Sequence, residues 1–198
     1  MRNFARLFAE LDASTATLAK VEALKRYFAS AASADAAWAV YFLAGGKPRQ
    51  VVPTALLRAL ACKLAGIGEW LFEESYQAVG DLAETIAHVL PPPRRRSEVG
   101  LAEWVEERLL PLRGAAPLDQ AERIATYWDE LDTAGRFLLT KLIGGGFRVG
   151  VSKLLVQRAL AEGAGIDAKL VAQRMMGYTD ANRMPTASGY DEIGRAHV

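Results

Sequence analysis

The chain has 198 residues, of which 51% are hydrophobic, and it contains 24 basic and 23 acidic side chains. This apolar content is sufficient for a buried core, which excludes a wholly disordered chain. The net charge of +1 excludes attraction of nucleic acid or an anionic membrane by the overall field of the protein. Any such partner must therefore be bound by a local patch.

Cysteine and histidine are scarce. Cys62 is the single cysteine, and His88 and His197 are the only histidines, so the sequence contains no cluster that resembles a zinc site. We expect neither a metal site nor a catalytic residue in this chain. The first residues include Glu10 and Asp12 in a helical pattern, unlike a secretory signal, and no segment has the roughly 20 apolar residues of a membrane span. We expect a cytoplasmic protein without membrane contact.

Apolar residues recur at helical spacing along almost the whole chain. Glycines, which commonly end helices, separate several of these segments. The predicted helices cover residues 4–11, 18–28, 34–43, 54–65, 69–79, 81–90, 101–110, 118–143, 153–161 and 168–176. Alternation typical of strands is nearly absent, so the expected fold class is all-α, a multi-helix domain with two helical halves.

A proline run marks the sharpest break in the pattern. Pro91, Pro92 and Pro93 cannot continue a helix, and three arginines follow them. We therefore expect a linker at residues 91–99 between a first helical half, residues 1–90, and a second, residues 100–190. Residues 191–198 resemble a translated sequencing adapter more than a helix, and we expect a non-native tail there, with the natural protein continuing differently beyond it.

Charge is polarised within the second half. Residues 98–132 contain nine acidic and three basic side chains, whereas residues 133–161 contain no acid. The basic residues of this acid-free window are Arg136, Lys141, Arg148, Lys153 and Arg158. Lys and Arg attract a phosphate backbone, and glycines let backbone amides approach it closely. The same pattern is also typical of a solvated connection between two helices, so charge alone leaves both interpretations open.

The centre of this window reads GGGFRVGVSK. Gly144 can end the preceding helix in the left-handed conformation, and Ser152 can cap the next helix, whose free amides attract an anion. A nucleotide-binding P-loop has a lysine where Val151 stands and follows a strand, so the nucleotide interpretation is disfavoured. The loop instead predicts a contact with backbone phosphate, with Arg148 as its main charge.

A second glycine loop and four tryptophans are further features of the sequence. A second glycine-basic loop, GGKPRQ, contains Lys47 and Arg49 and is another candidate for phosphate contact. Four tryptophans lie at helical-core spacing, and we expect them to pack in the core rather than stack on bases. They are Trp38, Trp70, Trp104 and Trp128.

Three separated segments carry a family resemblance. In chain order they read FARLFAELDASTATLAKVEALKRYF, LAGIGEWLFEESYQAVGDLAETIA and RFLLTKLIGGGFRVGVSKLLVQRALA. Together they resemble the N-terminal DNA-binding domain of ATP-dependent DNA ligases of the bacterial type. The resemblance covers nearly all of residues 1–190.

The resemblance implies an all-helical domain that docks on the minor groove of duplex DNA on both sides of a nick. Such a domain contacts mainly sugar and phosphate, so it binds with little sequence preference in DNA repair, replication or recombination. We expect nicked duplex DNA as the partner of a monomer. The expected DNA-contacting residues are Gly145, Gly146, Arg148, Gly150, Ser152 and Lys153, together with Lys47 and Arg49 of the second loop.

Members of this family join a 3′-hydroxyl to a 5′-phosphate with ATP and a divalent metal such as Mg²⁺. They do so through a lysine in a Lys-x-Asp-Gly motif that becomes adenylylated, and no lysine of this chain is followed by x-Asp-Gly. The resemblance therefore implies a ligase as the parent protein, whereas the chain alone is expected to bind neither cofactor and to be inactive.

Two alternatives remain open at this point. A helical protein-interaction scaffold could use the basic loop to bind an acidic partner. A sequence-specific helix-turn-helix regulator would need base-reading side chains, for which residues 153–161 offer only Lys153, Gln157 and Arg158.

Overall fold

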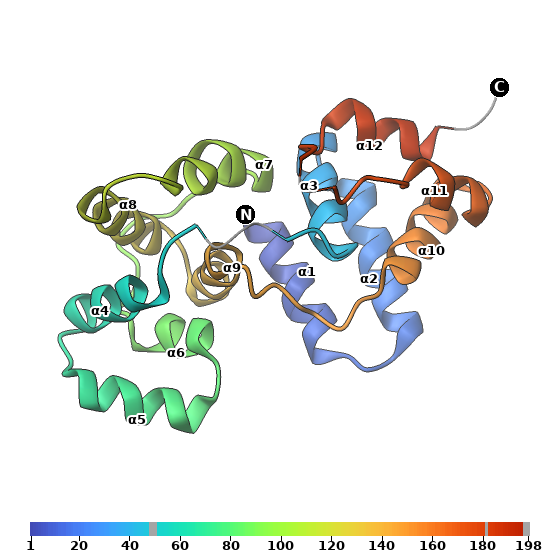
Figure 1. Ribbon diagram of the computed structural model, residues 1–198. Coiled ribbons are helices and arrows are strands. Elements are labelled where there is room, and N and C mark those ends of the chain that lie inside the picture. Colours follow the sequence, from blue (N-terminus) through green and yellow to red (C-terminus); the bar gives the residue numbers. More distant parts are fainter. Residues whose placement is uncertain (48–50, 181, 196–198) are drawn as a thin grey trace. The chain divides into compact units, whose positions relative to one another are not determined.

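The computed structural model describes residues 1–47, 51–180 and 182–195 (Figure 1). These residues form helices and no strand, which confirms the all-α fold class. They divide into two compact units that interleave along the chain. Unit 1 comprises Met1–Lys47, Gly100–Glu103 and Phe147–Val198, and unit 2 comprises Pro48–Val99 and Trp104–Gly146. The predicted linker at 91–99 lies inside unit 2, so the units differ from the sequential halves 1–90 and 100–190.

Unit 1 contains the N-terminal and C-terminal helices. They are α1 (Arg2–Ala13), α2 (Thr17–Ser30), α3 (Ser33–Leu43), a short α7 (Leu101–Glu103), α10 (Lys153–Ala164), α11 (Ala168–Arg174) and α12 (Ala187–Gly194). Helix α10 packs along α2, and α12 packs on α3. The apolar stripe of α1 is buried, as its helical spacing predicted. Every residue of α3 from Ala36 to Leu43 is buried, so this helix is the centre of the unit.

Unit 2 contains the remaining helices. They are α4 (Thr54–Ala65), α5 (Glu69–Val79), α6 (Leu82–Val89), the π-helical turn η1 (Trp104–Leu109), the 3-10 turn η2 (Leu110–Leu112), α8 (Pro117–Glu130) and α9 (Thr133–Gly144). Helix α9 packs on α6, and α8 packs on α4. Trp104 and Trp128 are fully buried in its core, as predicted, and Trp38 is buried in unit 1. The prediction was wrong for Trp70 on α5, which is 72% exposed.

The single helix predicted over residues 118–143 is in fact two helices. Leu131 is extended between them, with φ −116° and ψ 139°. The Asp132 side chain accepts a hydrogen bond from the Gly135 N–H at 2.8 Å and so begins α9. An aspartate at the N-cap stabilises a new helix start, which the continuous apolar spacing concealed.

Two other boundaries differ from the sequence prediction. The helix expected over residues 101–110 has only one α-helical turn, α7, before the chain becomes π-helical and then 3-10. Residues 192–194, which we assigned to a non-native tail unlike a helix, continue α12 to Gly194. The origin of the tail stays a prediction.

The helices after α1 form two repeats, α2 to α6 and α8 to α12. Helices α2 and α8 each have 14 residues, α4 and α10 each have 12, and α6 and α12 each have 8. Helices α4 and α10 end at Gly66 and Gly165, both left-handed with φ 66°. In unit 1, α2 and α3 pack on α10 and α12, and in unit 2, α8 and α9 pack on α4 and α6. Each unit therefore combines the first part of one repeat with the second part of the other.

Asp81 has two stabilising roles in unit 2. Its carboxylate caps α6 by accepting the Glu84 N–H at 3.0 Å, and it forms an ion pair with Lys141 of α9. Partial burial raises the pKa of Asp81, but the hydrogen bonds from Lys141 and from backbone amides outweigh it and hold the pKa below its ordinary value. The charged form of Asp81 is therefore the form that stabilises the fold.

We expect Asp81→Ala to lower the free energy of unfolding by about 2 kcal/mol at pH 7, since a cap and a partly buried ion pair are lost. Because the folded-state pKa is lowered, this difference is complete above the ordinary aspartate pKa and shrinks as the pH falls through the lowered one. Urea unfolding from pH 7 down to pH 3 measures it. Asp119→Ala in the exposed first turn of α8 is the control, and an equal loss in both variants contradicts the assignment.

Candidate nucleic-acid interface

The loop after α9 begins in unit 2 and continues in unit 1. In unit 2, Gly145 takes the left-handed conformation, with φ 70°, and ends α9 one residue later than predicted. Gly146 is exposed, and its N–H donates to the Lys141 carbonyl at 3.2 Å. These two predicted contact residues therefore form the end of a helix.

The part of the loop in unit 1 is anchored by two buried side chains. Phe147 stacks on Phe4 with a centroid separation of 5.9 Å and lies edge-on to Phe8 at 5.1 Å. Val149 is also buried, whereas Arg148 between them is exposed. The alternation of buried and exposed positions holds Arg148 at the surface.

Lys20 of helix α2 contacts this loop, and the sequence did not predict that contact. Its amine donates to the Gly150 carbonyl at 2.9 Å and to the Val149 carbonyl at 3.4 Å. Gly150 is left-handed, with φ 62°, and a side chain there would begin 3.1 Å from the Lys20 amine. Lys20 thus brings a cation to the part of the loop that follows Arg148. No sequence motif indicates this contact, because the two residues are far apart in the chain and meet only through tertiary packing.

The following residues begin α10. The Ser152 hydroxyl accepts the Leu155 N–H at 3.2 Å, which confirms its predicted capping role. Ser152 and Lys153 are both exposed at this helix start. Four of the predicted contact residues, Arg148, Gly150, Ser152 and Lys153, therefore lie on one continuous surface segment of unit 1.

The structure separates the charges of the acid-free window. Arg136 is buried and donates to the carbonyls of Trp128 and Pro91, each at 2.7 Å. Lys141 pairs with Asp81, and Arg158 pairs with Glu162 at 2.7 Å. Among the described residues, Arg148 and Lys153 have no carboxylate within ion-pair distance. The charge available to a phosphate in this segment is therefore concentrated on Arg148 and Lys153.

The second loop lies after α3. Gly45 and Gly46 end this helix, with φ 101° at Gly45 and a 2.8 Å hydrogen bond from the Gly46 N–H to the Tyr41 carbonyl. Lys47 is exposed in unit 1, and its carbonyl accepts the Tyr41 hydroxyl at 3.4 Å. Arg49 lies outside the described residues.

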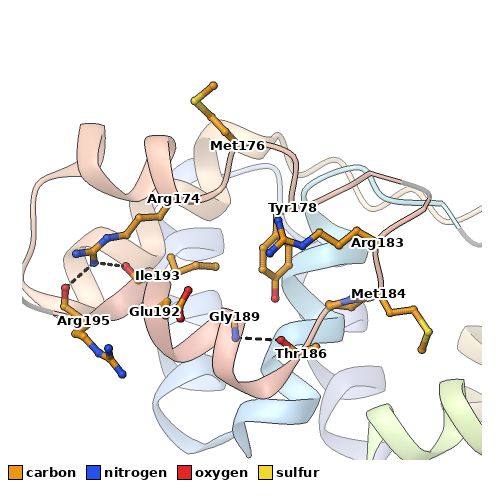
Figure 2. Close-up of a pocket in the computed structure, with 11 residues that line it drawn as sticks. Arg174, Met176, Tyr178, Arg183, Met184, Thr186, Gly189, Glu192, Ile193 and Arg195 are labelled. Carbon is orange, nitrogen blue, oxygen red and sulfur yellow. Dashed lines mark hydrogen bonds between the residues drawn. The ribbon is translucent and has the colours of Figure 1, made fainter.

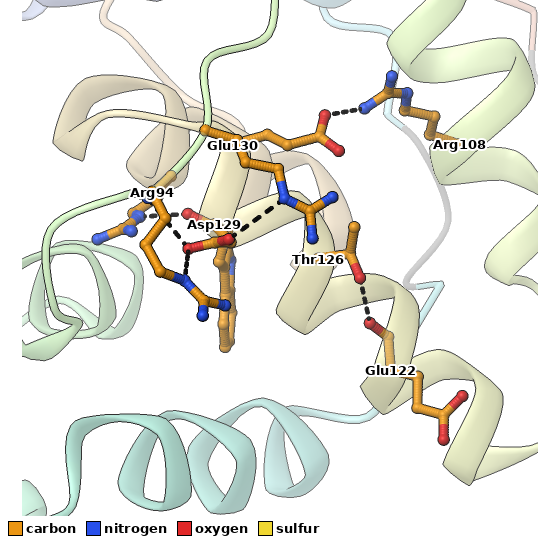
Figure 3. Close-up of polar contacts among 9 residues, drawn as sticks. Arg94, Arg108, Glu122, Thr126, Asp129 and Glu130 are labelled. Carbon is orange, nitrogen blue, oxygen red and sulfur yellow. Dashed lines mark hydrogen bonds and ion pairs between the residues drawn. The ribbon is translucent and has the colours of Figure 1, made fainter.

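Two of the three arginines after the proline run, Arg94 and Arg95, contact Asp129 of α8. Arg94 Nε donates to Asp129 Oδ1 at 3.1 Å, and Arg95 lies 3.7 Å from Oδ2 of the same carboxylate (Figure 3). These contacts, the hydrogen bond from Arg94 foremost, lower the pKa of Asp129. Arg108 forms a 2.6 Å ion pair with Glu130 nearby. This cluster fixes the chain after the prolines to α8 and leaves these arginines partly neutralised.

A separate hollow of about 310 Å³ lies at the C-terminal end of unit 1. Figure 2 shows Arg174 donating to the Ile193 carbonyl at 3.0 Å and to the Arg195 carbonyl, while Thr186 caps α12 by accepting the Gly189 N–H. Its polar groups hold the two ends of α12, and none of the predicted contact residues lines it.

Metal-binding clusters and membrane-spanning helices are both absent from the described residues. No group of three or more His, Cys, Asp or Glu side chains is placed to hold a metal ion within the parts of the chain that the structure describes. Over the same residues, no helix combines the length and apolar character needed to cross a bilayer.

The candidate interface thus lies in an all-helical protein, on a loop that exposes Arg148 between two buried residues and is contacted by a lysine of another helix. Among protein-family models, the one described as the DNA ligase N terminus matches residues 1–161. The chain belongs to the DNA ligase N-terminal family. A search of curated proteins gave no match.

We expect Gly150→Ala to lower the free energy of unfolding by about 1–2 kcal/mol, because alanine is strained in the left-handed conformation. Gly146→Ala is the matched control, since a side chain there meets no atom within 4 Å and φ is not positive. Its effect should stay within about 0.5 kcal/mol, as for other surface changes. Chemical denaturation of both variants tests this difference, and equal losses would show that the left-handed turn at Gly150 is not required.

Proposed function

We propose that this chain is the DNA-binding region of an ATP-dependent DNA ligase and that it holds nicked duplex DNA for strand joining in repair or replication. The observation that carries this proposal is Arg148, an exposed guanidinium without a carboxylate partner among the described residues, held between two buried neighbours. Family membership supports a ligase-related role. A monomer working in the cytoplasm is part of the proposal.

The proposed contacts are with the sugar-phosphate backbone. Arg148 and Lys153 meet phosphates, and the exposed Ser152 hydroxyl and the Gly150 backbone lie on the same segment. Lys47 and Arg49, with Gly145 and Gly146, complete the proposed set. Contacts of this kind position a protein on the duplex but carry no base sequence, so binding is independent of sequence.

A protein-interaction scaffold is the alternative function. The same exposed arginine and lysine suit an acidic protein surface, and family membership does not by itself decide the partner of this segment. The two functions differ in their ligand: a scaffold binds its protein partner through Arg148 and does not bind nicked duplex.

Binding of nicked duplex should weaken steeply with salt. If about five phosphates are contacted, the slope of log affinity against log salt is about −4 to −5, because each contact releases condensed counterions. Arg148→Gln should weaken binding and make the slope shallower by about 0.9, the contribution of one phosphate. Fluorescence anisotropy with a labelled nicked duplex over a series of salt concentrations measures both quantities.

Arg158→Gln is the matched control for this measurement, since Arg158 is a neighbouring arginine already paired with Glu162. It should leave the slope unchanged. Absence of any binding by the unmodified chain at low salt contradicts the DNA-binding function, and an unchanged slope in Arg148→Gln removes Arg148 from the interface.

We propose further that the parent ligase uses ATP and Mg²⁺ through residues outside this chain. The chain has no lysine followed by x-Asp-Gly, so no side chain here is expected to accept the adenylyl group. Incubation with ATP labelled at the α-phosphate and with Mg²⁺ should leave the protein unlabelled, and nicked DNA should stay unsealed. A covalent label on any lysine of this chain refutes this assignment.

A further inference from the structure

A second hollow, of about 430 Å³, lies in unit 2 beside the proline run. This volume is within the range of small-molecule sites. Helices α4, α8 and α9 and the segment that follows α6 form its wall, which includes three arginines and one carboxylate. None of the proposed DNA-contacting residues lines it. The hollow is therefore a feature that the proposed function does not use.

Arg136 of α9 is the most buried charge in this wall, with 3% of its surface exposed. Its Nε and Nη1 donate to two neutral groups, the carbonyls of Trp128 and Pro91. Within the described part of the chain, no carboxylate lies within ion-pair distance of Arg136, and its Nη2 makes no hydrogen bond. Burial lowers the pKa of Arg136. A buried cation is stabilised by an anion, so Arg136 retains the capacity to bind one.

Trp128 of α8 adds a second buried donor to the same wall. The residue is 1% exposed, and its indole N–H has no hydrogen-bond partner. Buried N–H groups in proteins are nearly always hydrogen-bonded to protein or to a bound molecule. Arg136 and Trp128 thus both have unused hydrogen-bonding capacity in the wall of one hollow.

The rim of the hollow is also positively charged. Arg94 and Arg95 both line it, with side chains 83% and 62% exposed, and they share the single carboxylate of Asp129 (Figure 3). One carboxylate cannot compensate three guanidinium groups. Two positive charges of the wall therefore remain without a negative charge of the wall to balance them.

Backbone hydrogen bonds fix the segment that carries the rim arginines. The N–H groups of Arg95 and Ser97 donate to the carbonyls of Asp129 and Glu130, at 3.1 Å and 3.0 Å. The bond from Arg136 to the Pro91 carbonyl, at 2.7 Å, fixes the start of the same segment. A site whose backbone is already ordered loses less conformational entropy when it binds a ligand.

The rest of the wall is mainly apolar. Leu64, Leu90, Pro92 and Ala125 line the hollow opposite in character to the arginines, and Leu64 is 37% exposed. Apolar walls with a few convergent polar groups are typical of sites for organic molecules. The wall is thus suited to a ligand with an apolar group and an anionic group.

We propose that this hollow binds a small organic phosphate monoester, whose phosphate is bound by Arg136, Arg95 and Arg94 and whose apolar group contacts Leu64 and Pro92. A phosphate monoester carries nearly two negative charges at neutral pH, which matches the two uncompensated positive charges. Guanidinium groups bind phosphate oxygens through paired, charge-assisted hydrogen bonds. The inference goes beyond the proposed function and does not depend on it.

Phenyl phosphate is the probe for this site, because it combines a phosphate monoester with an apolar ring. Isothermal titration calorimetry of the full chain at constant ionic strength should show saturable binding of one molecule per chain. Inorganic phosphate, which lacks the ring, should bind about tenfold more weakly. No saturable binding of phenyl phosphate up to about 10 mM overturns the site, and equal affinities for the two probes overturn the apolar contact.

Two variants test the position of the site without removing Arg136, whose loss would free two carbonyls of unit 2. Arg95→Gln should weaken binding of phenyl phosphate about fivefold to tenfold, the effect of losing one charge-assisted contact. Ala125→Leu, at a half-buried position of α8, should weaken it at least as much by filling the hollow. Arg96→Gln is the matched control, since Arg96 belongs to the same arginine run but does not line the hollow. Equal affinities of Arg95→Gln, Ala125→Leu and Arg96→Gln overturn the assignment.

A competition experiment distinguishes this ligand from the phosphates of DNA. Saturating phenyl phosphate at constant ionic strength should leave the anisotropy of a labelled nicked duplex mixed with the chain unchanged. Displacement of the duplex, absent in Ala125→Leu, would show that the hollow binds DNA phosphate and would overturn the small-molecule assignment.

Discussion

The packing of Phe147 is the constraint on which the candidate interface depends. Its ring is held by Phe4 and Phe8 of α1 and lies 5.7 Å from Phe42 of α3. Burial of such a ring contributes about 1.5–3 kcal/mol. With Val149 also buried, the side chain of Arg148 has no place in the core and must face solvent. The position of the charge is thus determined by buried aromatic residues that are distant in sequence.

The same reasoning explains why charge counted along the sequence overstates the charge of a surface. Three of the five basic residues in the acid-free window are used inside the protein or in ion pairs. Lys20 comes from outside that window yet lies against Gly150. A cation is available to a phosphate only if its environment leaves it without a competing carboxylate, and that environment is a property of tertiary packing.

Local physics made most helices predictable. The helix-separating glycines Gly66 and Gly80 correspond to helix ends in the structure. The helix break at Asp132 was not predicted because apolar residues recur at helical spacing on both sides of it. The exposure of Trp70 was not predicted because spacing alone does not say which helix faces are covered by other helices. The interleaved units were also missed, since the helices that pack together come from distant parts of the sequence, as α2 does with α10 and α4 with α8.

The two repeats share one feature of the candidate interface, a side chain that fixes a loop, and differ in the charge of that side chain. Lys20 and Gln120 occupy matching positions and both donate to a loop carbonyl, so the bond is a common device for fixing the loop. Only Lys20 adds a positive charge, and Gln120 is buried. Unit 1 therefore combines loop anchoring and charge in one side chain. In unit 2 these tasks are separate, because a neutral amide fixes the loop there.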